Sequence, residues 1–89
     1  MLICGITVRY EDEEGSPTMQ AGLLEDRSLS GVGISLTYPI AIGSKVKIQG
    51  RVRQLDGIVQ YCHAKGASYF VGILLDQVDV TWRRFGAGL

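Results

Sequence analysis

The sequence predicts an all-β fold, a small barrel of six antiparallel strands. Apolar and polar residues alternate with a period of two along short runs, and turn residues separate those runs at close spacing. The 89 residues are enough for a single domain, which we place at 1–89. A core of this size needs nearly every apolar strand residue. The alternation predicts that the following five are buried: Val46, Ile48, Val59, Val71 and Ile73.

Three of the expected strands lie in the first 36 residues. Residues 3–10 alternate between two faces, as a half-buried strand does. A polar loop at 11–18 contains a glycine and a proline, which are typical of a hairpin connection. A second strand is expected at 19–26, and a short third strand at 33–36 follows a polar turn.

The other three expected strands follow a connection at 37–44, where a proline and a Gly-Ser pair favour irregular structure. The run at 45–49 alternates cleanly and predicts the fourth strand. A long fifth strand is expected at 52–62. Its period breaks near its start, and Gly57 lies inside it, so we expect a bulge or a sharp bend there. A turn then leads to the last strand at 69–75.

The C-terminal residues predict a short helical turn. Trp82 and Phe85 are three residues apart, which places both rings on one side of a helix, and Gly86 can end it. We expect the two rings to pack on the barrel or on a partner, because burial of each stabilises by about 1.5–3 kcal/mol.

The composition is that of a globular domain, with 46% hydrophobic and 20% charged residues. No apolar run approaches the roughly 20 residues that span a bilayer, and the start of the chain does not resemble a signal peptide. Cys4 and Cys62 are too few and too far apart for a disulfide scaffold or a zinc site. We therefore expect a cytoplasmic protein with two buried thiols and no membrane partner.

The net charge of zero comes from two unlike segments. Residues 1–26 hold six acidic side chains and one basic one, and residues 27–66 hold six basic side chains and one acidic one. Solvated strand faces and a charged loop would explain this segregation. The segregation also allows a basic stripe that faces an anion, but it does not establish one. The bases of the 45–49 run lack interleaved aromatic residues, so nucleic acid is not an expected partner.

No residue pattern predicts an enzyme. His63 follows Cys62 directly, but neighbours in a strand point to opposite faces, so the two side chains should diverge. The chain has no second histidine, no phosphate-binding loop and no dinucleotide fingerprint. We expect no catalytic residues, no metal and no cofactor, and we interpret His63 as a turn residue.

The segment "DRSLSGVGISL" carries more hydrogen-bonding groups than a plain turn requires. Its spacing Asp26-x-Ser28-x-x-Gly31 resembles the D/N-x-S-x-x-G motif of the PilZ family, and "GSKVKIQGRV" and "LDGIVQYCHAKGASYFVGILLD" are similar to later strands of that family. The resemblance implies a six-stranded PilZ-like barrel that acts as a receptor for the bacterial second messenger cyclic di-GMP. It also places Asp26, Ser28 and Gly31 at the nucleotide.

The chemistry of these three residues suits a guanine base, although a purely structural role is also open. An ionised Asp26 can accept two hydrogen bonds from the N1–H and N2–H donors of guanine. Ser28 can add a bond, and Gly31 can allow a close backbone approach or a positive φ. Aspartate and serine also stabilise turns by bonding their own backbone, which would require no ligand.

The resemblance also implies a second signature, R-x-x-x-R near the first strand, whose arginines bind the phosphates of the ligand and stack against its guanines. This signature is absent. Arg9 stands alone in that region, and the substitutes are Arg27, Arg51 and Arg53. Either an N-terminal arm has been lost or this is a variant that works without the nucleotide. We expect binding of cyclic di-GMP to be weak or lost. The alternative function is a protein–protein adaptor that docks a partner protein or a neighbouring domain.

Overall fold

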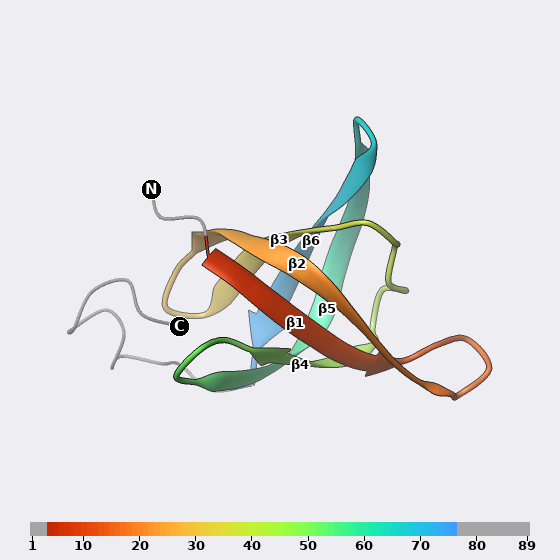
Figure 1. Cartoon of the computed structure of the whole chain (residues 1–89), viewed down its shortest axis with the longest axis horizontal. Helices are drawn as coiled ribbons and strands as arrows, with labels where there is room; N and C mark the ends of the chain where they lie inside the picture. The colour runs from red at the N-terminus through yellow and green to blue at the C-terminus, as the bar shows by residue number, and fades with distance from the viewer. Residues whose placement is uncertain (1–3, 77–89) are drawn as a thin grey trace.

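Six antiparallel strands close into a barrel in the computed structural model, which describes residues 4–76 (Figure 1). Their order around the barrel is β1-β2-β3-β6-β5-β4, and β4 closes the barrel by pairing with β1. The all-β, six-stranded antiparallel fold predicted from the alternation is confirmed. The strand bounds are β1 Cys4–Glu11, β2 Pro17–Arg27, β3 Gly31–Leu36, β4 Lys45–Gln49, β5 Gln54–Lys65 and β6 Ser68–Leu75.

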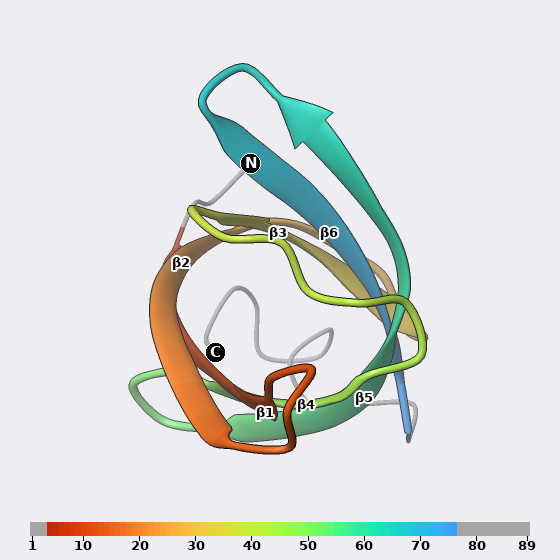
Figure 2. The same ribbon diagram turned by 90° about the vertical axis from the view of Figure 1, so that its right-hand side faces the viewer.

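The turns divide between the two ends of the barrel. The antiparallel order places the β2–β3 and β4–β5 turns at one end, with the start of β1 and the end of β6. The β1–β2 and β5–β6 turns lie at the opposite end. The connection at 37–44 crosses this second end, because β3 and β4 are not neighbours in the barrel (Figure 2).

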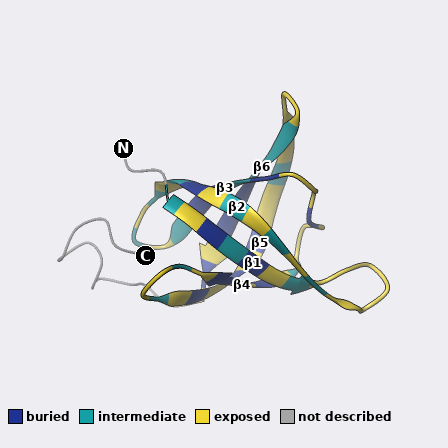
Figure 3. Ribbon diagram, in the orientation of Figure 1, coloured by how far each residue is buried: buried dark blue, intermediate teal, exposed yellow. Residues whose placement is uncertain are grey.

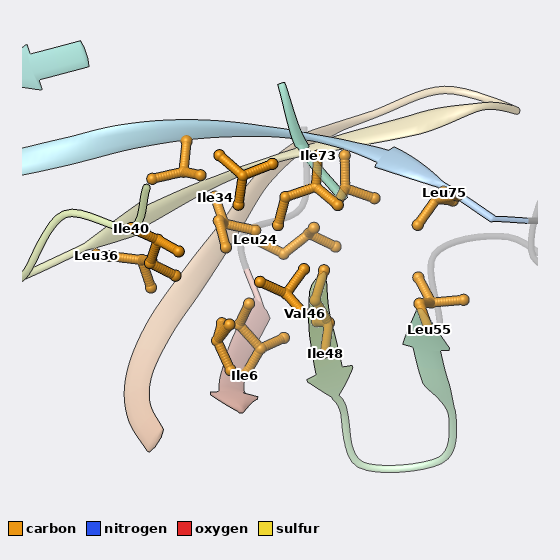
Figure 4. Close-up of a cluster of buried hydrophobic side chains, with 14 residues drawn as sticks. Ile6, Leu24, Ile34, Leu36, Ile40, Val46, Ile48, Leu55, Ile73 and Leu75 are labelled. Atoms are coloured by element: carbon orange, nitrogen blue, oxygen red, sulfur yellow. The ribbon is translucent and has the colours of Figure 1, made fainter. Parts of the chain in front are cut away.

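The core is a cluster of fourteen buried hydrophobic side chains on the inner face of the barrel (Figure 4). All five residues predicted to be buried belong to it, with exposed fractions of 0 to 3%. Figure 3 shows the alternation along the strands, where buried and exposed positions succeed one another. In β4 this pattern is strict, since Val46 and Ile48 face inward between three exposed residues.

The break in the fifth strand lies elsewhere than predicted. β5 begins at Gln54, and Val52 and Arg53 belong to the preceding turn, in which the Gly50 N–H donates to the Arg53 carbonyl at 2.8 Å. The alternation of apolar and polar residues breaks after Val52 because Val52 and Arg53 belong to this turn and not to the strand. The irregularity of the β5–β6 ladder lies between Val59 and Tyr61, and a further one interrupts the β2–β3 ladder between Leu24 and Asp26.

Three smaller expectations need correction or lie outside the structure. Cys4 and Cys62 pack against the core but are half-buried rather than buried, because Cys4 begins β1 and Cys62 lies where β5 leaves the barrel. His63 is an exposed residue inside β5 and not a turn residue, since the turn is formed by Gly66 and Ala67. The expected helical turn with Trp82 and Phe85 lies outside the described residues.

Candidate functional site

The motif residues line one groove on the outer surface of the barrel. Asp26, Arg27, Ser28 and Gly31 contribute one wall from the β2–β3 turn, and Tyr61 contributes to the other wall from β5. The groove has a volume of about 270 Å³. The structure thus brings together four of the six residues singled out in the sequence.

Strand register explains why Tyr61 belongs to the same groove as Asp26. Asp26 pairs with Gly33, Gly33 with Gly72, and Gly72 with Tyr61, so these residues form one row across β2, β3, β6 and β5. Side chains directly opposite one another in neighbouring strands point to the same face. The row is therefore a polar residue and an aromatic residue with two glycines between them.

The two glycines of this row allow aromatic rings to lie on the sheet. A side chain on Gly72 would collide with the ring of Tyr61, and one on Gly33 would collide with the ring of Phe70. The Tyr61 and Phe70 ring centroids are 6.3 Å apart. This aromatic surface was not predicted. The glycines and aromatic residues were visible in the sequence, but only the register shows that they meet.

The hydrogen bonds of the motif are local. The Arg27 N–H donates to Asp26 Oδ1 at 2.9 Å, and the Ser28 N–H donates to the Gly31 carbonyl at 2.8 Å. Ser28 Oγ lies 3.5 Å from the same carbonyl. Asp26 and Ser28 therefore bond the local backbone and stabilise the turn, which is the structural role described above. Because Asp26 is exposed, its carboxylate is also accessible from the groove.

Gly31 is required because another backbone segment approaches it closely. It does not have a positive φ, which among the described residues occurs only at Gly15, Gly43 and Gly66. A Cβ at position 31 would lie 2.9 Å from the carbonyl oxygen of Ile73. The Leu75 N–H donates to the Ser30 carbonyl at 2.8 Å, which fixes the turn to the end of β6.

We expect Gly31→Ala to lower the free energy of unfolding by about 1–3 kcal/mol, because the added methyl group pushes β3 away from β6. Urea denaturation measures this difference. Gly5→Ala is the matched control, since a Cβ there meets nothing within 4 Å. Equal stability of the two variants would contradict the close-approach argument.

The candidate phosphate-binding arginines do not all reach the groove. Arg51 and Arg53 lie in the β4–β5 turn, at the same end of the barrel, but neither lines the groove. Arg27 is thus the one basic residue in the groove lining among residues 4–76. A second cavity, of about 600 Å³, lies between β1, β4 and β5, where the side chains of Arg9, Lys45 and Lys47 alternate with acidic ones such as Asp56. The lysines of β4 therefore belong to a mixed surface rather than a basic stripe.

Within residues 4–76, the structure has no helix of the length and apolarity needed to cross a membrane. The same residues contain no group of three or more His, Cys, Asp or Glu side chains that could hold a metal ion. Comparison with known proteins gives no match to a protein-family model, to a curated protein or to a solved structure.

Proposed function

We propose that this chain is a non-catalytic regulatory domain of the PilZ type, whose outer groove receives a guanine base of cyclic di-GMP with low affinity. The observation that carries the proposal is the placement of the exposed Asp26 carboxylate and the Tyr61 ring in one groove. The resemblance of the Asp26-x-Ser28-x-x-Gly31 segment to the family motif supports the same ligand.

Each wall of the groove suits a different part of a guanine base. The carboxylate of Asp26 can accept hydrogen bonds from two adjacent N–H donors on the base edge. Tyr61 is 39% exposed as a residue, and its ring can stack against the base. The rings of Tyr61 and Phe70 cover the two glycine positions of this row, so the base would lie against an aromatic surface.

The low affinity follows from the charge of the groove. Cyclic di-GMP carries two phosphates, and charge-assisted hydrogen bonds contribute about 1.5–3 kcal/mol each. Arg27 is the basic residue that lines the groove, and acidic Asp26 stands beside it. A ligand with two negative charges therefore lacks the paired cations that high affinity requires.

We expect cyclic di-GMP to bind with a Kd above about 100 μM. In an NMR titration, amide signals of Gly31, Gly33 and Gly72 should shift, because these backbone groups lie in the groove. Asp26→Ala should remove the shifts. Asp56→Ala is the matched control, since Asp56 is also an exposed carboxylate and lines the other cavity. A Kd near about 1 μM that Asp26→Ala abolishes would contradict the low affinity.

A second candidate, a protein–protein adaptor, is favoured by exposed apolar residues on the same outer face. Ile58 and Leu74 are cross-strand neighbours, 38% and 43% exposed, and Leu74 borders the groove. Such a patch fits a protein contact that needs no nucleotide. The Asp26→Ala variant separates the two functions, because it removes the guanine contact and leaves this apolar pair unchanged.

A further inference from the structure

The β5–β6 hairpin extends past the barrel, and one edge of β5 is open there (Figures 1 and 2). β4 pairs with β5 only from Gln54 to Ile58, whereas β6 pairs with it as far as Lys65. Next along the open edge, Val59 exchanges hydrogen bonds with the loop at 43–44. From Tyr61 to Lys65, no strand of the described residues lies beside this edge.

The spacing of residues from the β5–β6 turn shows which backbone N–H and C=O groups point towards the open edge. Lys65 and Ser68 flank a two-residue turn and form its hydrogen-bonded pair. Hydrogen-bonded and non-hydrogen-bonded pairs alternate in an antiparallel ladder. Cys62 and Ala64 therefore direct their N–H and C=O groups away from β6. Within residues 4–76, no hydrogen bond joins these four groups to another residue.

The other projecting hairpin shows how an edge is protected in the same protein. β2 is unpaired on its β3 side before Gly22, but this edge begins with Pro17, which has no N–H. The side-chain amide of Gln20 also bonds the backbone of Tyr38, through its Oε1 and its Nε2, each at 3.1 Å. Among the described residues, the β5 edge has no such protection beyond the charge of Lys65.

We propose that a second copy of this chain pairs with the open edge of β5, antiparallel and around a two-fold axis at His63. In this register Cys62 faces the partner's Ala64, and Ala64 faces the partner's Cys62. Each pair exchanges two hydrogen bonds, so all four edge groups of each copy are satisfied. The self-complementary register favours a second copy over an unrelated peptide.

The side chains of the edge fit the same register. Tyr61 faces the partner's Lys65, which allows a cation–π contact on each side of the axis. Lys65 already makes such a contact within the chain, with its Nζ 5.4 Å from the centroid of Phe70. Between residues 57 and 75, Lys65 is the only charged side chain of the types Asp, Glu, Lys and Arg. Because Lys65 lies opposite Tyr61 in this register, no two lysines face each other.

Sedimentation equilibrium of the full chain at concentrations up to about 1 mM tests the proposal, since this range reveals even a weak dimer. The average mass should rise from 9.7 kDa towards twice that value. Ala64→Pro removes an N–H that makes no hydrogen bond within residues 4–76, and it should keep the protein monomeric. Ala64→Thr keeps that N–H and should associate as the unmodified chain does.

A cross-link provides a second test in case Ala64→Pro fails to fold. His63→Cys, made together with Cys62→Ala, places two thiols across the axis at a Cα separation of about 4.5 Å, within the range of a disulfide. Mild oxidation should give a covalent dimer much faster than for Ala67→Cys in the same background. A monomer at every concentration, or equal cross-linking of the two variants, would overturn the proposal.

Discussion

Fusion of a segment carrying R-x-x-x-R ahead of Leu2 is expected to tighten the binding of cyclic di-GMP by about 10²- to 10⁴-fold. Two charge-assisted contacts to phosphate contribute about 3–6 kcal/mol together, and each 1.4 kcal/mol is about tenfold in affinity. β1 starts at Cys4, which pairs with Leu24, two residues before Asp26. Arginines placed ahead of β1 therefore enter at the groove end of the barrel.

Calorimetric titration measures this gain, with an arm of the same length carrying A-x-x-x-A as the control. Asp26→Ala in the arginine-bearing chain should remove most of the gained affinity, because the arginines and the carboxylate hold different parts of one ligand. An equal gain from both arms would show that the missing cations do not limit binding. No gain from either arm would favour the adaptor function.

The strands could be predicted because each buries one face, so the sequence itself alternates. β4 was predicted at its observed bounds, since Val46 and Ile48 alternate with charged or polar residues and a glycine turn lies on each side. β5 was harder. Val52 is apolar like a strand residue, although it lies in the turn before Gln54. The irregularity between Val59 and Tyr61 lies beyond Gly57 and contains neither glycine nor proline. The position of that bulge is set by the pairing of β5 with β6, which the local sequence does not indicate.

The candidate site could be predicted only in its local part. Asp26, Ser28 and Gly31 lie within six residues, so their proximity follows from the chain itself. Tyr61 meets them through three successive strand pairings, two of which contain an irregularity. A shift of one residue in either ladder would place Asp26 and Tyr61 on opposite faces of the sheet. The position of Arg51 and Arg53 outside the groove depends on a further pairing, that of β4 with β5.

Leu24→Ala is expected to lower the free energy of unfolding by about 3–5 kcal/mol, whereas Leu23→Ala should change it by less than about 1 kcal/mol. The two leucines are neighbours in β2, and removing either side chain deletes the same atoms. Leu24 is 1% exposed and lies in the core, and Leu23 is 46% exposed on the outer face. The difference between the variants therefore isolates the effect of burial.

The size of the effect follows from the small core. A domain of this length is stabilised by roughly 4–13 kcal/mol in total, so the cavity left by Leu24→Ala removes a large share. The melting temperature should fall by more than about 12 °C, since 1 kcal/mol corresponds to about 4–8 °C in a domain of this size. Thermal and urea unfolding followed by circular dichroism measure both variants. Equal losses at the two positions would mean that β2 does not present alternate residues to the barrel core, and the register that places Asp26 opposite Gly33 would fail with it.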